Sequence, residues 1–390
     1  MVKGWGEKTL GELLRYEQPQ KYIVSSAEYE DNGVPVLTAG KSLILGYTNE
    51  RDGIYSKLPV IIFDDFTTES KYITYRFKIK SSAMKLLTST GVCDIRLVYA
   101  LMQMIKFPLK DHQRYWISEY SKLTVTIPLD STEQRRIAAM LLDIDALIAV
   151  LEKLITKKRN IKQGAMQDLL TGKRRLPGFS GEWVEKTLGK AALDIKTGKR
   201  NNEDKVENGK YSFFVRSQQV ERINDYGYDC EAILIPGEGN IGQIFHYING
   251  KFDCHQRVYK ISNFVDVDAK FIFYYLKMFF GQYALMNTVK ATVDSLRLPT
   301  FVNFEMRIPQ NTAEQTAIAA ILSDMDAEID ALAAKLAKLK HIKQGMMSEL
   351  LTGKIRLAEQ KHTGTHSPEE EPERSPGFRG TYSTVQGLST

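Results

Sequence analysis

The chain has 390 residues, of which 43% are hydrophobic and 26% charged, and its net charge is +6. This length predicts at least two domains, and the composition is typical of globular proteins; the basic balance permits nucleic-acid binding without proving it. No run of 18 apolar residues, no apolar signal core and no CxxC pair occur, so we expect no transmembrane helix, no secretion and no metal site, and a cytoplasmic protein.

The first 131 residues contain short runs of β-branched and aromatic residues separated by turn formers, which predicts a mixed domain of short strands. Its predicted strands are Pro35–Thr38, Ser42–Tyr47, Pro59–Phe66, Tyr72–Ile79 and Lys122–Ile127. Asp94–Ile105 is the best helix candidate within it.

A long stretch then occurs twice, as Thr132–Leu176 and Ala313–Leu357, at a constant offset of 181 residues (314 − 133 = 181). Its apolar residues alternate at spacings of four and three, which predicts a long amphipathic helix with a coiled-coil seam. The predicted seam residues are Ile137, Leu141, Ile144, Ile148 and Leu151 in the first copy, and Ile318, Leu322, Met325, Ile329 and Leu332 in the second. Each copy is the simplest partner for the other, so we expect an antiparallel pair.

The ends of these helices carry their own signals. Ser131 or Thr132 is the predicted N-cap of the first helix and Thr312 that of the second. Gly164 and Gly345 fall inside the pattern, so we expect each helix to bend or break there.

The repeat also includes the segments that flank the helices. Residues 185–189 (EKTLG) repeat residues 7–11, and Ile308-Pro309 repeats Ile127-Pro128, so the repeating unit is a whole domain followed by its helix. The interiors of the two domains do not resemble each other in sequence. The second has predicted strands at Tyr211–Val215, Ala232–Pro236, Gln243–Tyr247 and Arg257–Ile261, and a predicted helix at Ala269–Tyr283.

The predicted fold class is α+β, with two mixed α/β domains separated by two long antiparallel helices in a pseudo-twofold internal repeat. The predicted limits are residues 1–131 and 178–312 for the domains and 132–177 and 313–357 for the spacer helices. Residues 358–390 are polar and are expected to be a disordered tail.

Two motifs suggest chemistry but fit it poorly. Residues 237–242 (GEGNIG) match a dinucleotide-binding pattern, yet a second predicted strand follows where that site needs a helix. Asp64, Asp65, Glu69 and Lys71 resemble a nuclease carboxylate set at too short a spacing. An enzyme using either motif, or a coiled-coil adaptor that binds no DNA, remains an alternative to a DNA-binding protein.

The chain resembles the specificity (S) subunits of type I restriction–modification enzymes. The resemblance rests on the EKTLG openings, the Ile-Pro and Glu-Gln residues that lead into each helix, the IAAxLxDxDA cores and the IKQGxMxxLLTGK exits. It implies two target-recognition domains that each read one half of a bipartite double-stranded DNA site, on helices that bind two methyltransferase subunits. It also implies a non-catalytic chain with no bound cofactor, because S-adenosylmethionine, ATP and Mg belong to the methyltransferase and the restriction/translocase subunits.

Polar and basic clusters within the two domains are the candidate DNA contacts, because Arg, Gln and Asn suit base edges and Lys and Ser suit phosphates. In the first domain they are Lys71, Tyr72, Lys78, Lys80, Ser81 and Ser82. In the second they are Arg216, Ser217, Gln218, Arg222, Asn224, Gln256 and Arg257.

Overall fold

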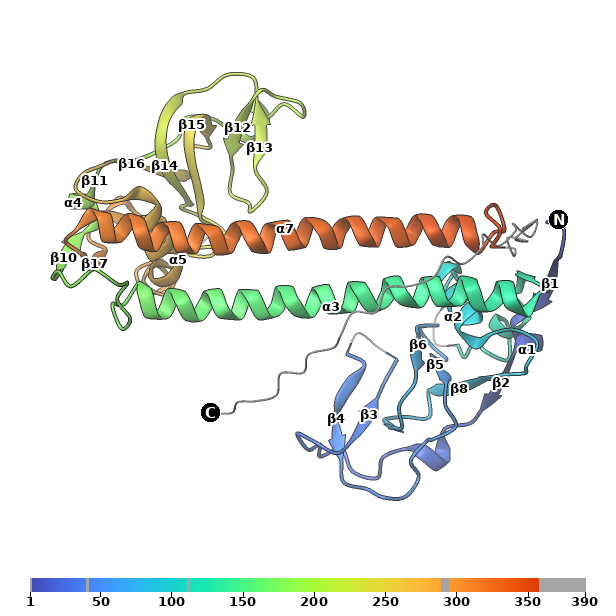
Figure 1. The fold of residues 1–390 in the computed structure, drawn as a ribbon. Coiled ribbons are helices and arrows are strands. Elements are labelled where there is room, and N and C mark those ends of the chain that lie inside the picture. Colours follow the sequence, from blue (N-terminus) through green and yellow to red (C-terminus); the bar gives the residue numbers. More distant parts are fainter. Residues whose placement is uncertain (1, 40–41, 111–112, 289–294, 358–390) are drawn as a thin grey trace, which may run out of the picture.

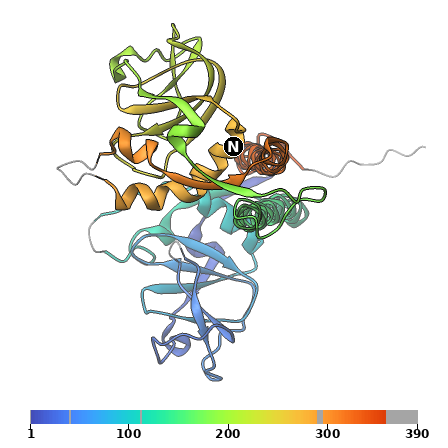
Figure 2. The same ribbon diagram turned by 90° about the vertical axis from the view of Figure 1, so that its left-hand side faces the viewer.

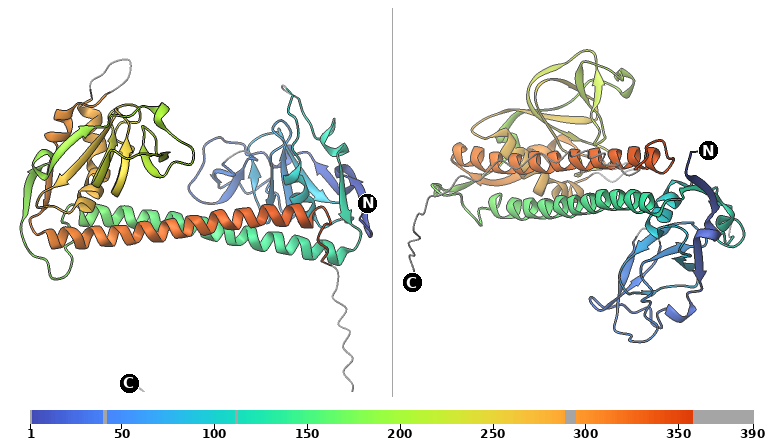
Figure 3. Two further views of the ribbon diagram at one scale, coloured as in Figure 1. Left: turned by 90° about the horizontal axis from the view of Figure 1, so that it is seen from above. Right: turned by 45° about the vertical axis from the view of Figure 1, so that its right-hand side comes forward.

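The structure is a computed structural model that describes residues 2–39, 42–110, 113–288 and 295–357. Two helices of 39 residues each, α3 (Ser131–Leu169) and α7 (Thr312–Leu350), lie side by side and antiparallel, with a globular domain at each end (Figure 1). Seen along the helices, the domains diverge above and below the pair (Figure 2). Seen from above, both rise from the same side of it (Figure 3, left). The predicted α+β fold with two long antiparallel helices is confirmed.

The predicted tail, residues 358–390, lies outside the described residues. Within the described part of the chain, no helix is both long enough and apolar enough to cross a membrane.

The first domain combines a four-stranded sheet (order β2-β8-β5-β6), a three-stranded sheet (β4-β3-β7) and the β1-β9 pair. Its strands are β1 (Trp5–Thr9), β2 (Leu14–Glu17), β3 (Val34–Leu37), β4 (Ile44–Thr48), β5 (Val60–Asp64), β6 (Ser70–Ile73), β7 (Lys78–Ile79), β8 (Met84–Ser89) and β9 (Thr124–Pro128). Its helices are α1 (Leu10–Leu13), α2 (Ile95–Met104), and the 3-10 turns Gln20–Tyr22 and Tyr120–Lys122.

The second domain has a six-stranded sheet (order β11-β16-β14-β15-β12-β13) and the β10-β17 pair. Its strands are β10 (Trp183–Thr187), β11 (Ala192–Thr197), β12 (Tyr211–Phe214), β13 (Glu221–Ile223), β14 (Tyr228–Pro236), β15 (His246–Cys254), β16 (Val258–Phe264) and β17 (Glu305–Pro309). Its helices are α4 (Leu188–Ala191), α5 (Ala269–Met286), α6 (Leu298–Val302) and the 3-10 turn Asn202–Asp204.

Both predicted internal helices are present, but two strand predictions are inaccurate: the strand predicted at Gln243–Tyr247 begins only at His246, and the run Tyr72–Ile79 is not one strand. The run Tyr72–Ile79 divides into β6, which ends at Ile73, and β7, which begins at Lys78. The division occurs because β6 pairs with β5 in one sheet while β7 pairs with β3 in the other, and the exposed residues 74–76 carry the chain between them.

The two domain interiors share a topology that their sequences conceal. In the first domain β8 pairs with β2 and β5, and β5 pairs with β6, all antiparallel. In the second, β16 pairs with β11 and β14, and β14 with β15, also antiparallel. A helix follows the equivalent strand in each, α2 after β8 and α5 after β16. The two interiors therefore differ in sequence but share one strand order, which is built from different side chains.

The N-caps of the long helices lie one residue earlier than predicted. Asp130 caps α3 with its carboxylate, which accepts from the backbone N–H of Thr132 at 3.0 Å. Asn311 caps α7, accepting from the backbone N–H of Ala313 at 2.9 Å. Both capping residues have extended backbones that direct a side-chain oxygen at the free N–H groups of the first turn, so Ser131, Thr132 and Thr312 are helical residues instead.

The predicted break at the internal glycines does not occur. α3 continues through Gly164 and α7 through Gly345. A glycine costs a helix only about 1 kcal/mol relative to alanine. Packing on both sides of these positions outweighs that cost, since Ala165 and Met166 enter one domain core and Met346 and Met347 pack on the other.

The apolar stripe of each long helix serves two purposes along its length. At one end of the pair, Ile137 and Leu141 of α3 and Leu350 of α7 enter the core of the first domain. At the other end, Ile318 and Leu322 of α7 enter the core of the second domain, with Met325 packed against it.

Only the middle of the stripe is a coil contact between the helices. Leu151 and Ile155 of α3 pack there against Ile329 and Leu332 of α7. Two further seam positions lie nearer the first domain: Ile144 is buried, and Ile148 lines a cavity beside Met347. The prediction of one continuous coil seam is therefore too simple, because the helix ends are shared with the domains.

Two equivalent ion pairs join α3 and α7, one at each end of the antiparallel helix pair. Arg356, just after α7, donates two hydrogen bonds to Glu133 at the start of α3, with Nε–Oε1 and Nη2–Oε2 distances of 2.6 and 2.7 Å. Arg175, just after α3, grips Glu314 at the start of α7 at the same distances. Both carboxylates are 1% exposed, so each bidentate pair is a short, charge-assisted contact in a buried place.

The neighbouring glutamines tie each helix to its own domain. The Gln134 side chain donates to the Pro128 carbonyl at 2.8 Å and accepts from the backbone N–H of Asp94, the N-cap of α2, at 3.1 Å. Gln315 makes the matching bonds to the Pro309 carbonyl and the backbone N–H of Asp268, the N-cap of α5, at 2.7 and 2.9 Å. The repeated Glu-Gln dipeptide therefore orients helix, strand and domain together.

We expect Arg356→Met to lower the melting temperature by several degrees, because it leaves the buried Glu133 carboxylate without its partner. Arg175→Met should have a similar effect through Glu314. Thermal unfolding followed by circular dichroism measures both, with Arg51→Met as control, an exposed arginine without an ion pair in the described structure. If the melting temperature of Arg356→Met equals that of the Arg51→Met control, the ion pair does not have this stabilising role.

Candidate nucleic-acid interface

Three loops of the second domain bring two of the candidate arginines to one carboxylate. Arg216 follows β12, Arg257 lies between β15 and β16, and Glu238 follows β14. The guanidinium groups of Arg216 and Arg257 lie 3.4 and 3.2 Å from the Glu238 carboxylate. Because two positive charges share one negative charge, the cluster is net positive, and both arginine side chains are exposed.

Two further candidates, Ser217 and Gln256, lie next to these arginines in the sequence. The Ser217 carbonyl lies 3.0 Å from Nε2 of the buried His246, and the Gln256 amide donates to Asn201 at 2.5 Å. His255, also buried, accepts from the backbone N–H of Arg257 at 3.0 Å. Burial, together with the positive charges of Arg216 and Arg257, lowers the pKa of His255 below its ordinary value. The remaining candidates, Gln218, Arg222 and Asn224, are exposed on or beside β13.

The GEGNIG segment is a connection between strands rather than a nucleotide site. It links β14 to β15, which pair as antiparallel neighbours, and residues 237–245 contain no helix. Gly242 has φ +68°, and a Cβ there would lie 2.5 Å from the Gly281 Cα of α5. The glycines therefore permit close packing of a loop on a helix, and the dinucleotide-binding alternative is wrong.

One candidate of the first domain must be withdrawn. Lys78 lies inside the domain, where its ammonium group contacts the Glu50 carboxylate at 2.5 Å and the Asp52 carbonyl at 2.8 Å. Its charge made it a candidate, but Lys78 lies in β7 between Phe77 and Ile79, which belong to a buried hydrophobic cluster of the first domain. A lysine already neutralised by an internal partner does not offer its charge to DNA.

The other first-domain candidates divide between two places. Lys71 and Tyr72 lie on β6, and the Tyr72 ring packs on Tyr99 of α2 at a centroid distance of 5.8 Å. Lys80, Ser81 and Ser82 form the connection from β7 to β8, with Lys80 and Ser82 exposed. The structure therefore groups these three but not the β6 pair with them.

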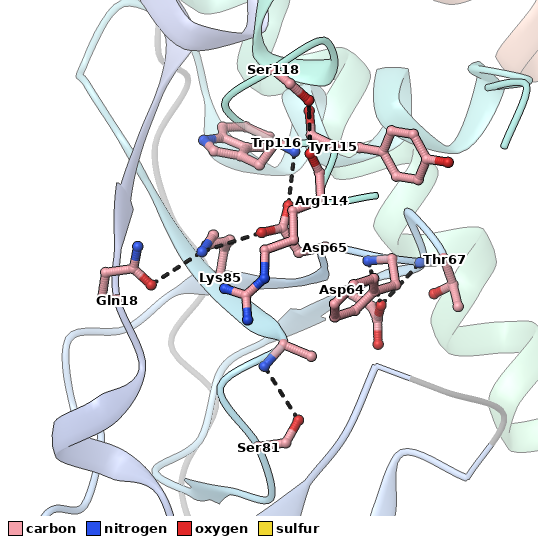
Figure 4. A network of polar contacts seen from close by, with 12 residues as sticks. Gln18, Asp64, Asp65, Thr67, Ser81, Lys85, Arg114, Tyr115, Trp116 and Ser118 are labelled. Carbon is pink, nitrogen blue, oxygen red and sulfur yellow. Dashed lines mark hydrogen bonds and ion pairs between the residues drawn. The ribbon is translucent and has the colours of Figure 1, made fainter. Parts of the chain in front are cut away.

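The β7–β8 connection joins a buried polar network centred on Asp65 (Figure 4). The Asp65 carboxylate contacts the Lys85 ammonium at 3.2 Å and accepts from the backbone N–H of Trp116 at 2.8 Å. Asp64 instead accepts from the backbone N–H groups of Phe66 and Thr67 at 2.9 and 3.0 Å. Both carboxylates thus hold the chain together, which argues against the nuclease-like alternative.

Backbone hydrogen bonds reveal an equivalent three-segment junction in each domain. In the first, the Asp65 N–H donates to the Ala83 carbonyl at 2.9 Å, and the Tyr115 N–H donates to the Asp65 carbonyl at 2.9 Å. In the second, the Gly237 N–H donates to the Arg257 carbonyl and the Leu296 N–H to the Gly237 carbonyl, both at 2.8 Å. We call these the first junction (residues 64–66, 81–83 and 113–116) and the second junction (residues 237–238, 255–257 and 295–297).

The junctions unite candidates that lie far apart in the sequence and add residues that were missed. Ser81 and Ser82 occupy the first junction, and Gln256 and Arg257 the second. Phe66, Arg114 and Glu238 were not selected, because the sequence does not show which loops meet. The arginine beside two aromatic residues in Gln113–Trp116 is a signal that could have drawn attention to Arg114.

The charged residues of the described chain offer nothing resembling a metal centre. No group of three or more His, Cys, Asp or Glu side chains is arranged to hold an ion within the ranges given above. Cys93, Cys230 and Cys254 are free thiols, and burial raises the pKa of each above its ordinary value.

Comparison with known proteins gives consistent matches. Residues 181–341 match the family described as type I restriction modification DNA specificity domain. The chain is 49% identical over 139 residues to the type I restriction enzyme EcoR124I/EcoR124II specificity subunit of Escherichia coli, covering 33% of this chain and 34% of that protein. It is 26% identical over 180 residues to the EcoDI specificity subunit of Escherichia coli, covering 45% and 39%. The matched parts thus span between a third and two fifths of these two relatives.

Two longer matches extend over most of the chain. One is the MjaVIII specificity subunit of Methanocaldococcus jannaschii, 24% identical over 399 residues and covering 90% of this chain and 93% of that protein. The other is the crystal structure of the type I restriction–modification S subunit from M. genitalium, with a TM-score of 0.72 at 16% identity and coverage of 89% and 96%. That likeness concerns the fold. With its repeated helices, its two domains and these matches, the chain is similar over most of its length to type I restriction–modification specificity subunits, and residues 181–341 match their DNA specificity domain.

Proposed function

We propose that the chain is the sequence-specific DNA-binding subunit of a type I restriction–modification complex and reads a bipartite site, one domain for each half. The observation that carries this proposal is the pair of equivalent junctions, each bearing exposed arginine, on domains fixed at opposite ends of one helical pair. A protein adaptor that binds no DNA would not need exposed arginines on equivalent loops of both domains. The coil residues and both ion-paired helix ends supply the fixed separation.

The length of the helices supports a gap between the two half-sites. A helix of 39 residues is roughly 58 Å long at 1.5 Å per residue. One turn of duplex DNA is about 34–36 Å. Two domains at opposite ends of such a pair would contact short segments separated by base pairs that neither domain reads.

We further propose that the helices bind two methyltransferase subunits and that restriction/translocase subunits join the same complex. The outer face of α3 supports a protein contact, because Met140, Leu147 and Val150 are 42%, 57% and 64% exposed. The pseudo-twofold repeat would offer the equivalent face of α7, where Glu328 replaces Leu147, to a second copy of the same partner. The chain itself would be non-catalytic, with S-adenosylmethionine, ATP and Mg held by the other subunits.

Methylation mapping tests the bipartite site directly. The chain is expressed in a host together with the modification subunit that co-purifies with it. We expect the genome of this host to carry one new methylated motif, made of two short defined segments separated by a fixed number of unspecified bases. A host with the modification subunit alone is the control. A continuous motif, or no new motif, would contradict the proposal.

The second domain offers a test within one half-site. We expect the double variant Arg216→Ala/Arg222→Ala to weaken binding of a duplex carrying the mapped motif by roughly tenfold or more, because two positive charges are lost near the DNA. Fluorescence anisotropy at fixed salt measures the affinity, with Lys57→Ala, which pairs with Glu17 in the first domain, as control. Equal affinities of wild type and double variant would remove these residues from the interface.

A further inference from the structure

Equivalent positions in the two junctions carry different side chains. The backbone bonds align Asp65 with Gly237, Ala83 with Arg257, and Tyr115 with Leu296. By the same alignment, Phe66 stands where the second domain has Glu238, and Arg114 stands where it has Ser295. Residues Glu238 and Ser295 form a β-bridge, and in the first junction the Arg114 guanidinium lies 5.5 Å from the centroid of the Phe66 ring. The same place in the fold therefore holds two arginines on a carboxylate in one domain and one arginine on an aromatic ring in the other.

The support beneath Arg114 is rigid. Its neighbours Tyr115 and Trp116 are buried, and Trp116 packs on Phe63 of β5 at a centroid distance of 5.2 Å. Their backbone N–H groups donate to Asp65, whose carboxylate is paired with the buried Lys85. An arginine held by a fixed backbone and a stacked ring loses little conformational freedom when it binds a ligand.

The exposed side of the contact between Arg114 and Phe66 faces solvent. Phe66 is 40% exposed, and Arg114 is exposed and makes no ion pair with any residue in the described ranges. A cation–π contact uses none of the N–H groups of a guanidinium as a hydrogen-bond donor to a polar atom, so the exposed N–H fork can still donate two parallel hydrogen bonds. In duplex DNA, the pair of acceptors that fits this fork best is O6 and N7 of guanine in the major groove.

We propose that Arg114, which lies over the Phe66 ring in a cation–π contact, is a specificity-determining residue of the first domain and reads a guanine of its half-site. This inference rests on the proposed function and adds to it a residue that the sequence did not single out. A phosphate contact is the competing role for an exposed arginine. The two roles differ because either lysine or arginine can contact a phosphate. A bidentate contact to a base needs the planar guanidinium of arginine, with its two parallel N–H donors.

The test compares Arg114→Ala, Arg114→Lys and Phe66→Leu with wild type in the complex with the modification subunit, by methylation mapping and by anisotropy on the wild-type motif. We expect both Arg114 variants to weaken binding by about ten- to a hundredfold and to accept any base at one G·C position of one half-site. Phe66→Leu should weaken discrimination between bases at the same position, because it removes the aromatic ring on which the Arg114 guanidinium lies. The other half-site should stay unchanged.

Two matched controls keep the result interpretable. Arg257→Ala changes the second junction and should alter only the opposite half-site. Arg51→Ala removes an exposed arginine of the first domain that lines a separate cavity with Thr48 and Arg76, and should alter no base preference. Thermal unfolding of each variant separates loss of fold from loss of contact, because Arg114 is exposed and its replacement should leave the melting temperature unchanged.

Several outcomes overturn the inference. Full activity of Arg114→Lys with unchanged base preference would assign Arg114 to a phosphate. An unchanged motif for Arg114→Ala would remove it from the interface, and relaxation at both half-sites would indicate a general rather than a local role. If wild type itself gives no gapped motif, the proposed function fails instead, so the two failures are distinguishable.

Discussion

The bidentate contact between an arginine that follows one long helix and a glutamate that begins the other is the interaction on which the rest of the architecture depends. It occurs twice, as Arg356 with Glu133 and as Arg175 with Glu314. Each carboxylate is buried, so it is stable there only with its partner in place. Each pair joins the end of one helix to the start of the other, and therefore holds the antiparallel pair in one register at both ends.

The helical pair is more than a spacer because its ends belong to the domain cores. The start of α3 and the end of α7 enter the core of the first domain, and the end of α3 and the start of α7 enter that of the second. A domain cannot rotate on its helix without exposing this apolar surface, at roughly 25 cal/mol for each Å². Fixed orientation of the domains follows from that packing, as fixed separation follows from the central coil contacts of Leu151 and Ile329.

A common strand order explains how one fold presents two different surfaces. The sheets place equivalent loops at each junction, and the backbone bonds of Asp65 and Gly237 hold those loops without depending on exposed side chains. The side chains on the loops are therefore free to differ, as Phe66 with Arg114 differs from Glu238 with Arg257. Such separation of scaffold from surface suits a protein whose two halves would read different sequences.

The sequence by itself determined the repeat, the two long helices, the pairing of Ile127-Pro128 and Ile308-Pro309 with each helix, and the resemblance to specificity subunits, because periodicity and repeated motifs are local properties of the chain. It could not show that Ile137 and Ile318 enter domain cores, that Lys78 is paired with Glu50, or that Arg114 meets Phe66. Those facts depend on contacts between residues far apart in the chain, such as Glu133 and Arg356, and only tertiary packing decides which loops meet. The sequence therefore predicted that the candidate site is basic and polar. Which residues lie together in it depends on the loops that meet at the two junctions.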